Sequence, residues 1–219
     1  ERRADELAHR VRITRPFWAS TTQVTRAQYF QVMGERPPNG EDDVPVTSIP
    51  WKKAIYYCIK LSIHENLEPA YVLSEDGLVR WRQNQQRPGY RLLTEAEWEY
   101  LARTGEPVPQ LDVAFLRTVA WYEENSQRQA QPVGRKAPNK WGCYDLLGNV
   151  YEWVWDYHQA DIGSGDAVDP TGPRTGRDRV IRGGSWRDTA AELQYTRRTK
   201  RDPQNVSSTI GFRIARSAS

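Results

Sequence analysis

The part of the chain that most constrains its fold is the segment of residues 139–156, NKWGCYDLLGNVYEWVWD. Its dipeptide Gly148-Asn149 is a strong turn signal, and residues 150–155 alternate and are rich in β-formers, so they predict a strand after the turn. Asp145 precedes the turn and Glu152 follows it. A chain that folds back here brings two carboxylates and several carbonyls together, and converging hard oxygen ligands suit Ca²⁺. A capped turn beside an unrelated surface glutamate has the same spacing.

Length and charge bound the class of protein. The length of 219 residues predicts one domain, residues 1–219, whose hydrophobic core is large enough to be stable without disulfides. No signal peptide is recognisable, and no apolar run approaches the roughly 20 residues of a membrane span, so we expect a cytoplasmic protein. The net charge is only +3, and both signs are interspersed, which argues against a nucleic-acid or membrane surface.

The composition is aromatic rather than aliphatic. Nine Trp and eleven Tyr accompany a mean hydropathy of −0.80, a balance that suits a loop-rich fold with an aromatic centre. Cys58 and Cys143 are the only cysteines, too few for a disulfide framework or a cysteine-rich metal site. Cys58 shares the apolar stripe of a predicted helix, so we expect it to be buried and inert.

Local signals predict a mixture of short helices and strands. Capping boxes begin helices at residues 26–33 and 95–103, and an amphipathic stripe predicts a third at residues 51–63. We interpret the acids Glu95, Glu97 and Glu99 as favourable first-turn charges rather than as catalytic groups. The remaining expectations are a strand of about eight residues from His9, a hairpin of residues 71–73 and 78–81, strands at 179–185 and 210–215, and irregular chain at 105–138 and 158–179.

Several motifs together carry a family resemblance. They are VTRAQY (24–29), Val46 with Trp51, GYRLLTEAEWEYLART (89–104), PVGRKAPNKWGCYDLLGNVYEWVWD (132–156), RVIRGGSW (179–186) and GFRIA (211–215). These motifs occur in the same order in the formylglycine-generating enzyme/sulfatase-modifying factor family, which the chain therefore resembles. The resemblance implies an α+β fold of the C-type lectin-like class, with little regular secondary structure. Relatives usually begin with a further glycine-rich strand, which leaves two alternatives: the chain is a piece of a longer polypeptide, or that strand is supplied from elsewhere.

The resemblance also implies a structural Ca²⁺. The family holds this ion at the stretch that matches residues 145–152. The ligands carried over are the side chains of Asp145 and Glu152 and the carbonyls of Gly148 and Val150, all of which this chain keeps. The ion would hold a loop whose ordering entropy the chain alone does not offset.

The family's oxidative chemistry is not expected here. The enzymes use a pair of cysteines that binds Cu(I) shortly after the Gly-Gly-Ser-aromatic motif. In this chain the first cysteine position matches Asp188, and the second falls within residues 190–193, none of which is Cys. Because soft metals need thiolates, we expect no copper and no formylglycine-generating activity.

A basic segment, residues 187–205, occupies the place of the cysteine pair. It carries five cations within residues 187–201, against a nearly neutral whole. Arginine and tyrosine on a rigid scaffold are typical of ligand-recognition loops. We therefore predict a site for a protein or acidic ligand, and leave open that the arginines instead pair internally with Asp188, Glu192 and Asp202. The predicted site residues are Arg187, Asp188, Tyr195, Arg197, Lys200 and Arg201.

The resemblance supports two classes of function. Cysteine-free relatives serve as binding domains, including the hypervariable receptors of diversity-generating retroelements, which favours a non-oxidase binding domain in a bacterial regulatory or defence system. The alternative is a cysteine-free enzyme of the same fold, as in siderophore maturation. A flat face lined by Arg and Tyr would favour binding, and a pocket with converging buried carboxylates would favour the enzyme.

Overall fold

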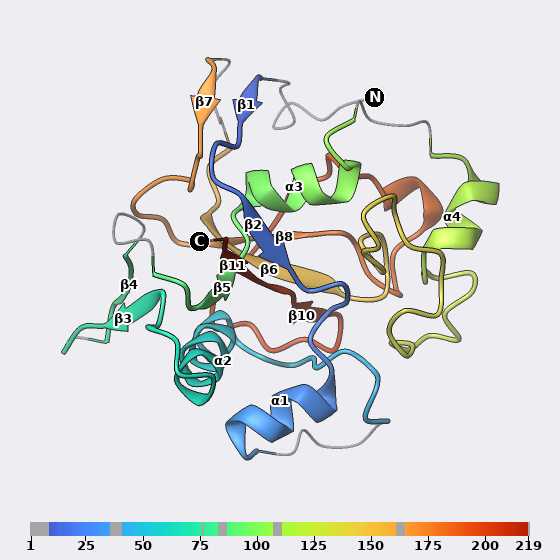
Figure 1. Cartoon of the computed structure of the whole chain (residues 1–219). Coiled ribbons are helices and arrows are strands. Elements are labelled where there is room, and N and C mark those ends of the chain that lie inside the picture. Colours follow the sequence, from blue (N-terminus) through green and yellow to red (C-terminus); the bar gives the residue numbers. More distant parts are fainter. Residues whose placement is uncertain are drawn as a thin grey trace.

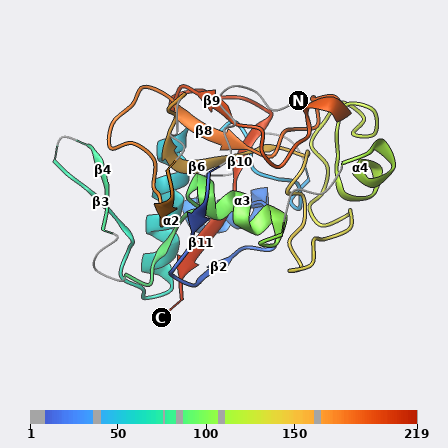
Figure 2. The same ribbon diagram turned by 90° about the horizontal axis from the view of Figure 1, so that it is seen from above.

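The structure is a computed structural model that describes residues 9–35, 41–75, 77–82, 87–106, 111–160 and 165–218. Its centre is a four-stranded sheet in the order β10-β6-β8-β9 (Figures 1 and 2). β6 runs parallel to β10 and antiparallel to β8, and β8 pairs antiparallel with β9. The turn at Gly148-Asn149 leads directly into β6, so the segment that dominates the sequence supplies the central strand. The bounds are Tyr151–Tyr157 (β6), Arg179–Arg182 (β8), Thr199–Arg201 (β9) and Ile210–Phe212 (β10).

Three smaller sheets surround this centre. In the three-stranded sheet, β11 lies between β2 and β5 and is antiparallel to both. β3 and β4 form the predicted hairpin, with Tyr71 opposite Trp81. β1 and β7 pair in parallel at the upper edge in Figure 1. The bounds are Val11–Arg12 (β1), Phe17–Ala19 (β2), Tyr71–Leu73 (β3), Val79–Trp81 (β4), Tyr90–Leu92 (β5), Ala167–Val168 (β7) and Ile214–Ser217 (β11).

The three predicted helices are confirmed, and each has a local cause. Thr25 and Thr94 cap α1 and α3 through capping boxes with Gln28 and Glu97. α1 ends at Gly34, whose φ of 74° favours glycine. α2 buries its apolar stripe, including Cys58. The helices are Arg26–Met33 (α1), Trp51–His64 (α2), Glu95–Arg103 (α3) and Val113–Val119 (α4), with a 3₁₀ turn at Ala190–Glu192 (η2).

Two buried apolar clusters lie on opposite faces of the central sheet. Successive strand residues point to opposite faces, so Trp153 and Ile181 join the cluster with α1 and α2, whereas Val154 and Val180 join the one with α3 and α4. Figure 1 shows α3 above the sheets and α1 and α2 below them. The same strands therefore serve both clusters. Within the described residues, no helix is both long and apolar enough to cross a bilayer.

The structure differs from the sequence prediction where pairing is long-range. The expected strand from His9 is divided into β1 and β2, which belong to different sheets. Between them Pro16 has no N–H to donate, and the N–H of Thr14 bonds to the Asp169 side chain. α4 lies in a region expected to be irregular. Its first turn is capped by Asp112, whose side chain accepts from the N–H of Phe115 at 2.7 Å, and aspartate is a preferred N-cap residue. β7 and β9 likewise lie in segments expected to be loops.

Candidate functional site

The turn at Gly148-Asn149 is fixed by close packing. Gly148 has φ 74° and Asn149 φ 55°. A Cβ on Gly148 would overlap the carbonyl oxygen of Trp121, so only glycine fits. The buried Asn149 side chain exchanges two hydrogen bonds of 3.0 Å with the backbone of Gln131. The turn is thereby held against the segment that contains Trp121 and Gln131.

A buried ion pair follows the turn. Glu152 accepts from Arg213 at 2.9 Å (Nη2 to Oε1) and at 3.1 Å (Nε to Oε2), and also from the indole N–H of Trp98 at 2.7 Å. Arg213 is fully buried and donates further to the carbonyls of Ser20 and Tyr144. Burial alone would lower the pKa of Arg213, but Glu152 holds it above the usual value. The charge of Glu152 is therefore balanced from within the protein.

Three of the four residues predicted to bind calcium, Asp145, Val150 and Glu152, contact Gln23. Its Nε2 donates to the carbonyls of Asp145 (3.2 Å) and Val150 (2.8 Å) and to Oε1 of Glu152 (3.1 Å). Oδ2 of Asp145 accepts from the N–H of Gly134 at 2.8 Å. The other oxygens, Oδ1 of Asp145 and Oε1 of Gln23, are buried and have no hydrogen-bond partner. Burial raises the pKa of Asp145 to about 6. Two orphaned acceptors in one buried cluster are a feature that a cation or water would satisfy.

The basic segment is held from beneath by Arg182. This fully buried side chain donates to the carbonyls of Tyr195 (2.8 Å), Thr196 (3.1 Å) and Arg197, and to Glu99 at 2.6 Å. The bend before the segment uses Gly183 (φ 97°) and Gly184 (φ 79°), so the strand predicted to run to residue 185 ends at Arg182. The backbone of the segment is thereby fixed by contacts on its inner side.

Asp188, at the position of the family's first cysteine, is fully engaged. Its Oδ2 accepts from the N–H and the hydroxyl of Ser185 at 2.9 and 2.6 Å, and its Oδ1 accepts from the hydroxyl of Tyr151 at 2.8 Å. The two thiols lie elsewhere, Cys58 in the cluster beside α2 and Cys143 in the cluster beside α3. Both are buried, and burial raises the pKa of each. No thiolate pair is available at this position.

The predicted binding residues separate into two groups. Arg187, Lys200 and Arg201 are exposed. Arg197 instead pairs with Glu192 at 3.1 Å and lies 3.6 Å from Asp188, which is the internal pairing that the sequence left open. The expectation that Tyr195 offers surface to a partner is wrong, because its side chain belongs to the buried cluster beside α3. Three exposed cations of the predicted site remain, Arg187, Lys200 and Arg201, together called the basic face here, and Lys200 also lies 3.9 Å from Asp178.

Sequence reasoning missed a cavity of about 640 Å³ beside α3. Its lining includes Glu95, Glu99, Asp156 and Arg198, of which the first two were interpreted as first-turn charges only. Glu95 and Glu97 do lie in the first turn of α3, and Glu97 also completes the capping box and pairs with Arg91 at 2.6 Å. The four-residue spacing of Glu95 and Glu99 on one helix face was the available signal.

Comparison with known sequences identifies a family and several relatives of this chain. Residues 1–218 match the model of the sulfatase-modifying factor enzyme 1-like domain. The chain is 30% identical to "Chaperone protein LppX" of Paenibacillus barcinonensis, over 92% of this chain and 80% of that protein. It is 28% identical to the formylglycine-generating enzyme of Bos taurus over 82% of this chain, and spans 48% of the length of that enzyme.

Solved structures show the same fold. "Treponema denticola variable protein 1" matches with a TM-score of 0.88 and 33% identity, over 96% of this chain and 87% of that one. CarF matches with a TM-score of 0.74 and 27% identity, over 93% and 87%. The predicted α+β fold of the formylglycine-generating-enzyme type is thereby confirmed. The chain belongs to the sulfatase-modifying factor enzyme 1-like domain family.

Proposed function

We propose that this chain is a non-oxidase binding domain that recognises an acidic ligand or protein through the basic face. The observation that carries the proposal is the anchoring by Arg182, which fixes three successive carbonyls of the segment from within. Arg187, Lys200 and Arg201 are exposed positions of the segment that these contacts hold. A rigid support with variable outward side chains is how binding loops combine position with specificity.

Two further findings support a binding role over the family's oxidation. Asp188 replaces the first cysteine with a carboxylate that already has three hydrogen bonds. One of the matching solved structures, at 33% identity, carries the name of a variable protein, which supports a receptor of the retroelement type. The cytoplasmic location and a role in a bacterial regulatory or defence system remain predictions from sequence.

The cysteine-free enzyme remains the second candidate function. It is favoured by one observation, the cavity beside α3, where the buried carboxyl of Asp156 lies among polar groups. Concave sites of this size that combine apolar walls with a few polar groups are typical of small-molecule binding.

The basic face is tested by charge reversal. The variant Arg187→Glu/Lys200→Glu/Arg201→Glu should bind immobilised poly-L-glutamate at least tenfold more weakly than the native protein, with the largest difference at low salt. Its melting temperature should stay within about 6 °C, since three exposed substitutions of about 0.5 kcal/mol or less each change stability by about 1.5 kcal/mol or less in total. Binding isotherms at several salt concentrations and thermal melts give the result.

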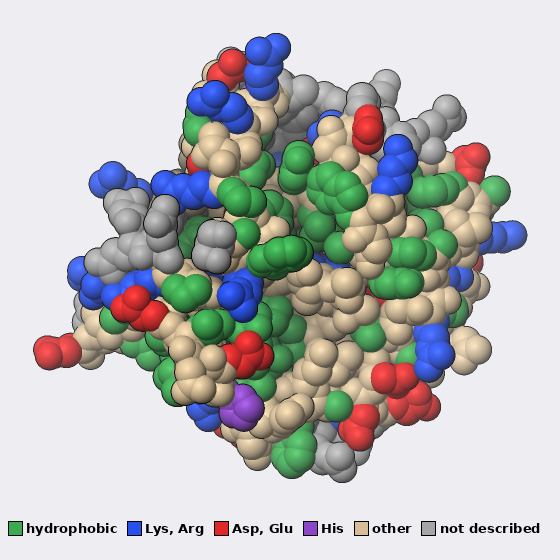
Figure 3. Space-filling view, viewed as in Figure 1, with side chains coloured by type: hydrophobic (Ala, Val, Ile, Leu, Met, Phe, Trp, Pro, Cys, Tyr) green, Lys and Arg blue, Asp and Glu red, His purple; other side chains and the backbone are tan. Residues whose placement is uncertain are grey.

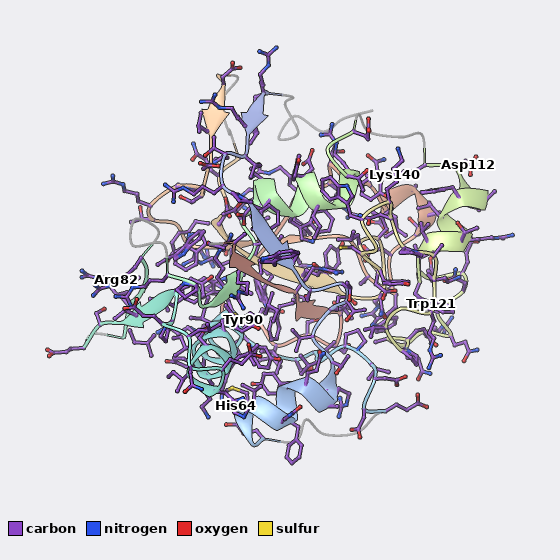
Figure 4. All side chains as sticks on the ribbon, viewed as in Figure 1. His64, Arg82, Tyr90, Asp112, Trp121 and Lys140 are labelled. Carbon is purple, nitrogen blue, oxygen red and sulfur yellow. The ribbon has the colours of Figure 1, made fainter. Side chains whose placement is uncertain are left out.

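A matched control carries the same change of net charge elsewhere. Arg12, Arg80 and Lys140 are also exposed cations, on other parts of the chain, and Figure 4 labels Lys140. Basic and acidic side chains are interspersed on the face shown in Figure 3, so net charge alone defines no site there. If the variant Arg12→Glu/Arg80→Glu/Lys140→Glu loses as much binding as the first, the effect is one of net charge and the basic face is not the site.

We also propose that the cluster around Asp145 holds a structural Ca²⁺. The support is the pair of orphaned oxygens, Oδ1 of Asp145 and Oε1 of Gln23, beside the carbonyl of Val150 and the carboxylate of Glu152. Rotation of the Gln23 amide would turn its oxygen toward the point where these groups converge. Gly148 completes the proposed set through its carbonyl. The ion would stabilise the turn and would take no part in a reaction.

Calcium removal gives the corresponding prediction. A ligand that binds only the folded state stabilises it by about 2.7 kcal/mol at a hundredfold excess over Kd. EDTA should therefore lower the melting temperature by about 5–10 °C, and Ca²⁺ but not Mg²⁺ should restore it. Asp145→Ala should remove the response to Ca²⁺. Equal melting temperatures in EDTA and in Ca²⁺, with no heat on titration, would exclude the ion.

A further inference from the structure

The cavity beside α3 has one polar side and one apolar side. Its volume is about 640 Å³, within the range of sites for small organic ligands. The apolar side comes from β1, β7 and the turn that follows β7. The polar side comes from α3, from the end of β6 and from the basic segment. The apolar residues of the first side are Val11, Ile13, Ala167, Pro170 and Pro173, and Ala96 lines the cavity from α3.

α3 presents a distinct face to each of its two neighbours. Trp98, Leu101 and Ala102 are buried in the cluster below the helix. Glu95, Glu99 and Arg103 follow one another at four-residue spacing and line the cavity. Because the apolar face fixes the helix, the polar face is held in place at the cavity.

The charges on this polar face are largely neutralised among themselves. Both oxygens of Glu95 accept from Arg198, at 2.7 and 2.9 Å. Glu99 accepts from Arg103 at 2.8 Å and from Arg182 at 2.6 Å. Each glutamate therefore has an arginine partner, and neither arginine that lines the cavity is left without a carboxylate.

Asp156 differs from these acids. It is 4% exposed, and its Oδ2 accepts from the N–H of Glu95, at the first turn of α3, at 2.8 Å. Within the described part of the chain, no ion pair joins Asp156 to a Lys, Arg or His, and burial and Glu95 raise its pKa more than the charge of Arg179 lowers it. Burial, followed by the nearby charge of Glu95, raises the pKa of Asp156 well above its usual value. A buried carboxyl without a counter-ion is costly to ionise, and a ligand cation would remove that cost.

The turn after β7 closes over the same group. A Cβ on Gly172 would lie 2.8 Å from Cβ and 3.0 Å from Oδ1 of Asp156. Because the glycine, with φ 70°, has no Cβ, the backbone can pass close to the carboxyl group without this overlap. Asp156 thus lies at the junction between the polar helix face and the apolar wall, where a ligand with one charged end would place that end.

We propose that this cavity binds a small primary amine with an apolar body, with its ammonium group against Asp156 and its body between β1 and the turn after β7. An ammonium group supplies three donors and one positive charge, which match the single unpaired carboxyl. An anionic ligand would have to compete with Glu95 and Glu99 for arginines that are already paired. The cavity is separate from the basic face, so either site can fail its test while the other stands.

The test compares three ligands of similar size and different charge. We expect 2-phenylethylamine to bind at least tenfold more tightly than 2-phenylethanol, and 3-phenylpropanoate to bind most weakly, in NMR and calorimetric titrations of the native chain. Asp156→Asn keeps an acceptor for the N–H of Glu95 and should reduce amine affinity at least tenfold. Asp112→Asn is the matched control, because Asp112 caps α4, where Figure 4 shows it, and asparagine caps equally well. It should leave amine affinity unchanged.

A second variant tests the place of binding without changing a charge. Ala96 lines the cavity from α3, so Ala96→Phe should fill the space and abolish amine binding, while the thermal melt still reports a folded protein. Equal affinity for amine and alcohol, preference for the carboxylate or absence of amine binding would overturn the proposal. So would an amine affinity that either Asp156→Asn or Ala96→Phe leaves unchanged.

Discussion

Arg213→Met is expected to lower the free energy of unfolding by about 3–5 kcal/mol, the usual cost of leaving a buried charge without its partner. Arg213 is fully buried, and its guanidinium holds Glu152 and two backbone carbonyls. The corresponding fall in melting temperature is about 6–20 °C for a chain of this size. Urea titration in calcium-free buffer measures the change.

Two further variants show whether the loss comes from the ion pair. Arg201→Met, an exposed position on β9, should change the free energy of unfolding by about 0.5 kcal/mol or less. Adding Glu152→Gln to Arg213→Met should recover part of the loss, because the unpaired charge is then gone. If Arg213→Met is as mild as Arg201→Met, or if the two losses in the double variant simply add, the buried pair does not stabilise the turn region.

Gly148→Ala should be the second large effect, at about 3 kcal/mol or more. A left-handed φ costs a non-glycine residue about 1–2 kcal/mol, and overpacking adds about 1–3 kcal/mol. At Gly148 both apply, because a methyl group would overlap the carbonyl of Trp121 and would lie 3.1 Å from the Trp121 nitrogen. Chemical denaturation of the purified variant gives the value.

Gly142 provides the matched comparison for Gly148. It has nearly the same backbone conformation, φ 77° against 74°, but nothing lies within 4 Å of the position of its Cβ. Gly142→Ala should therefore show only the conformational cost of about 1–2 kcal/mol. If the two substitutions destabilise equally, the contact with Trp121 has no energetic weight, and the turn is not held against that segment.

Features of short range were predictable from the sequence. The capping boxes at Thr25 and Thr94, the apolar stripe of α2 and the hairpin of β3 and β4 each depend on residues a few positions apart. Their energetics are local, so propensity and periodicity suffice. The turn at Gly148-Asn149 and the strand after it belong to the same class, and the family motifs added the overall fold.

The sites depended on contacts that local patterns do not encode. Whether Arg197 and Tyr195 face solvent was decided by Glu192 and by the core beside α3, and the basic face became smaller as a result. Sequence alone could place Asp156 at the end of a strand. Only the tertiary structure places it beneath the turn after β7 and against the first turn of α3, with no ion pair among the described residues. The burial and the charge pairing of a side chain depend on segments that lie far apart in the sequence and meet only in the folded chain. The sequence therefore determined the elements whose signals are local, and the tertiary structure decided which side chains remain free to bind.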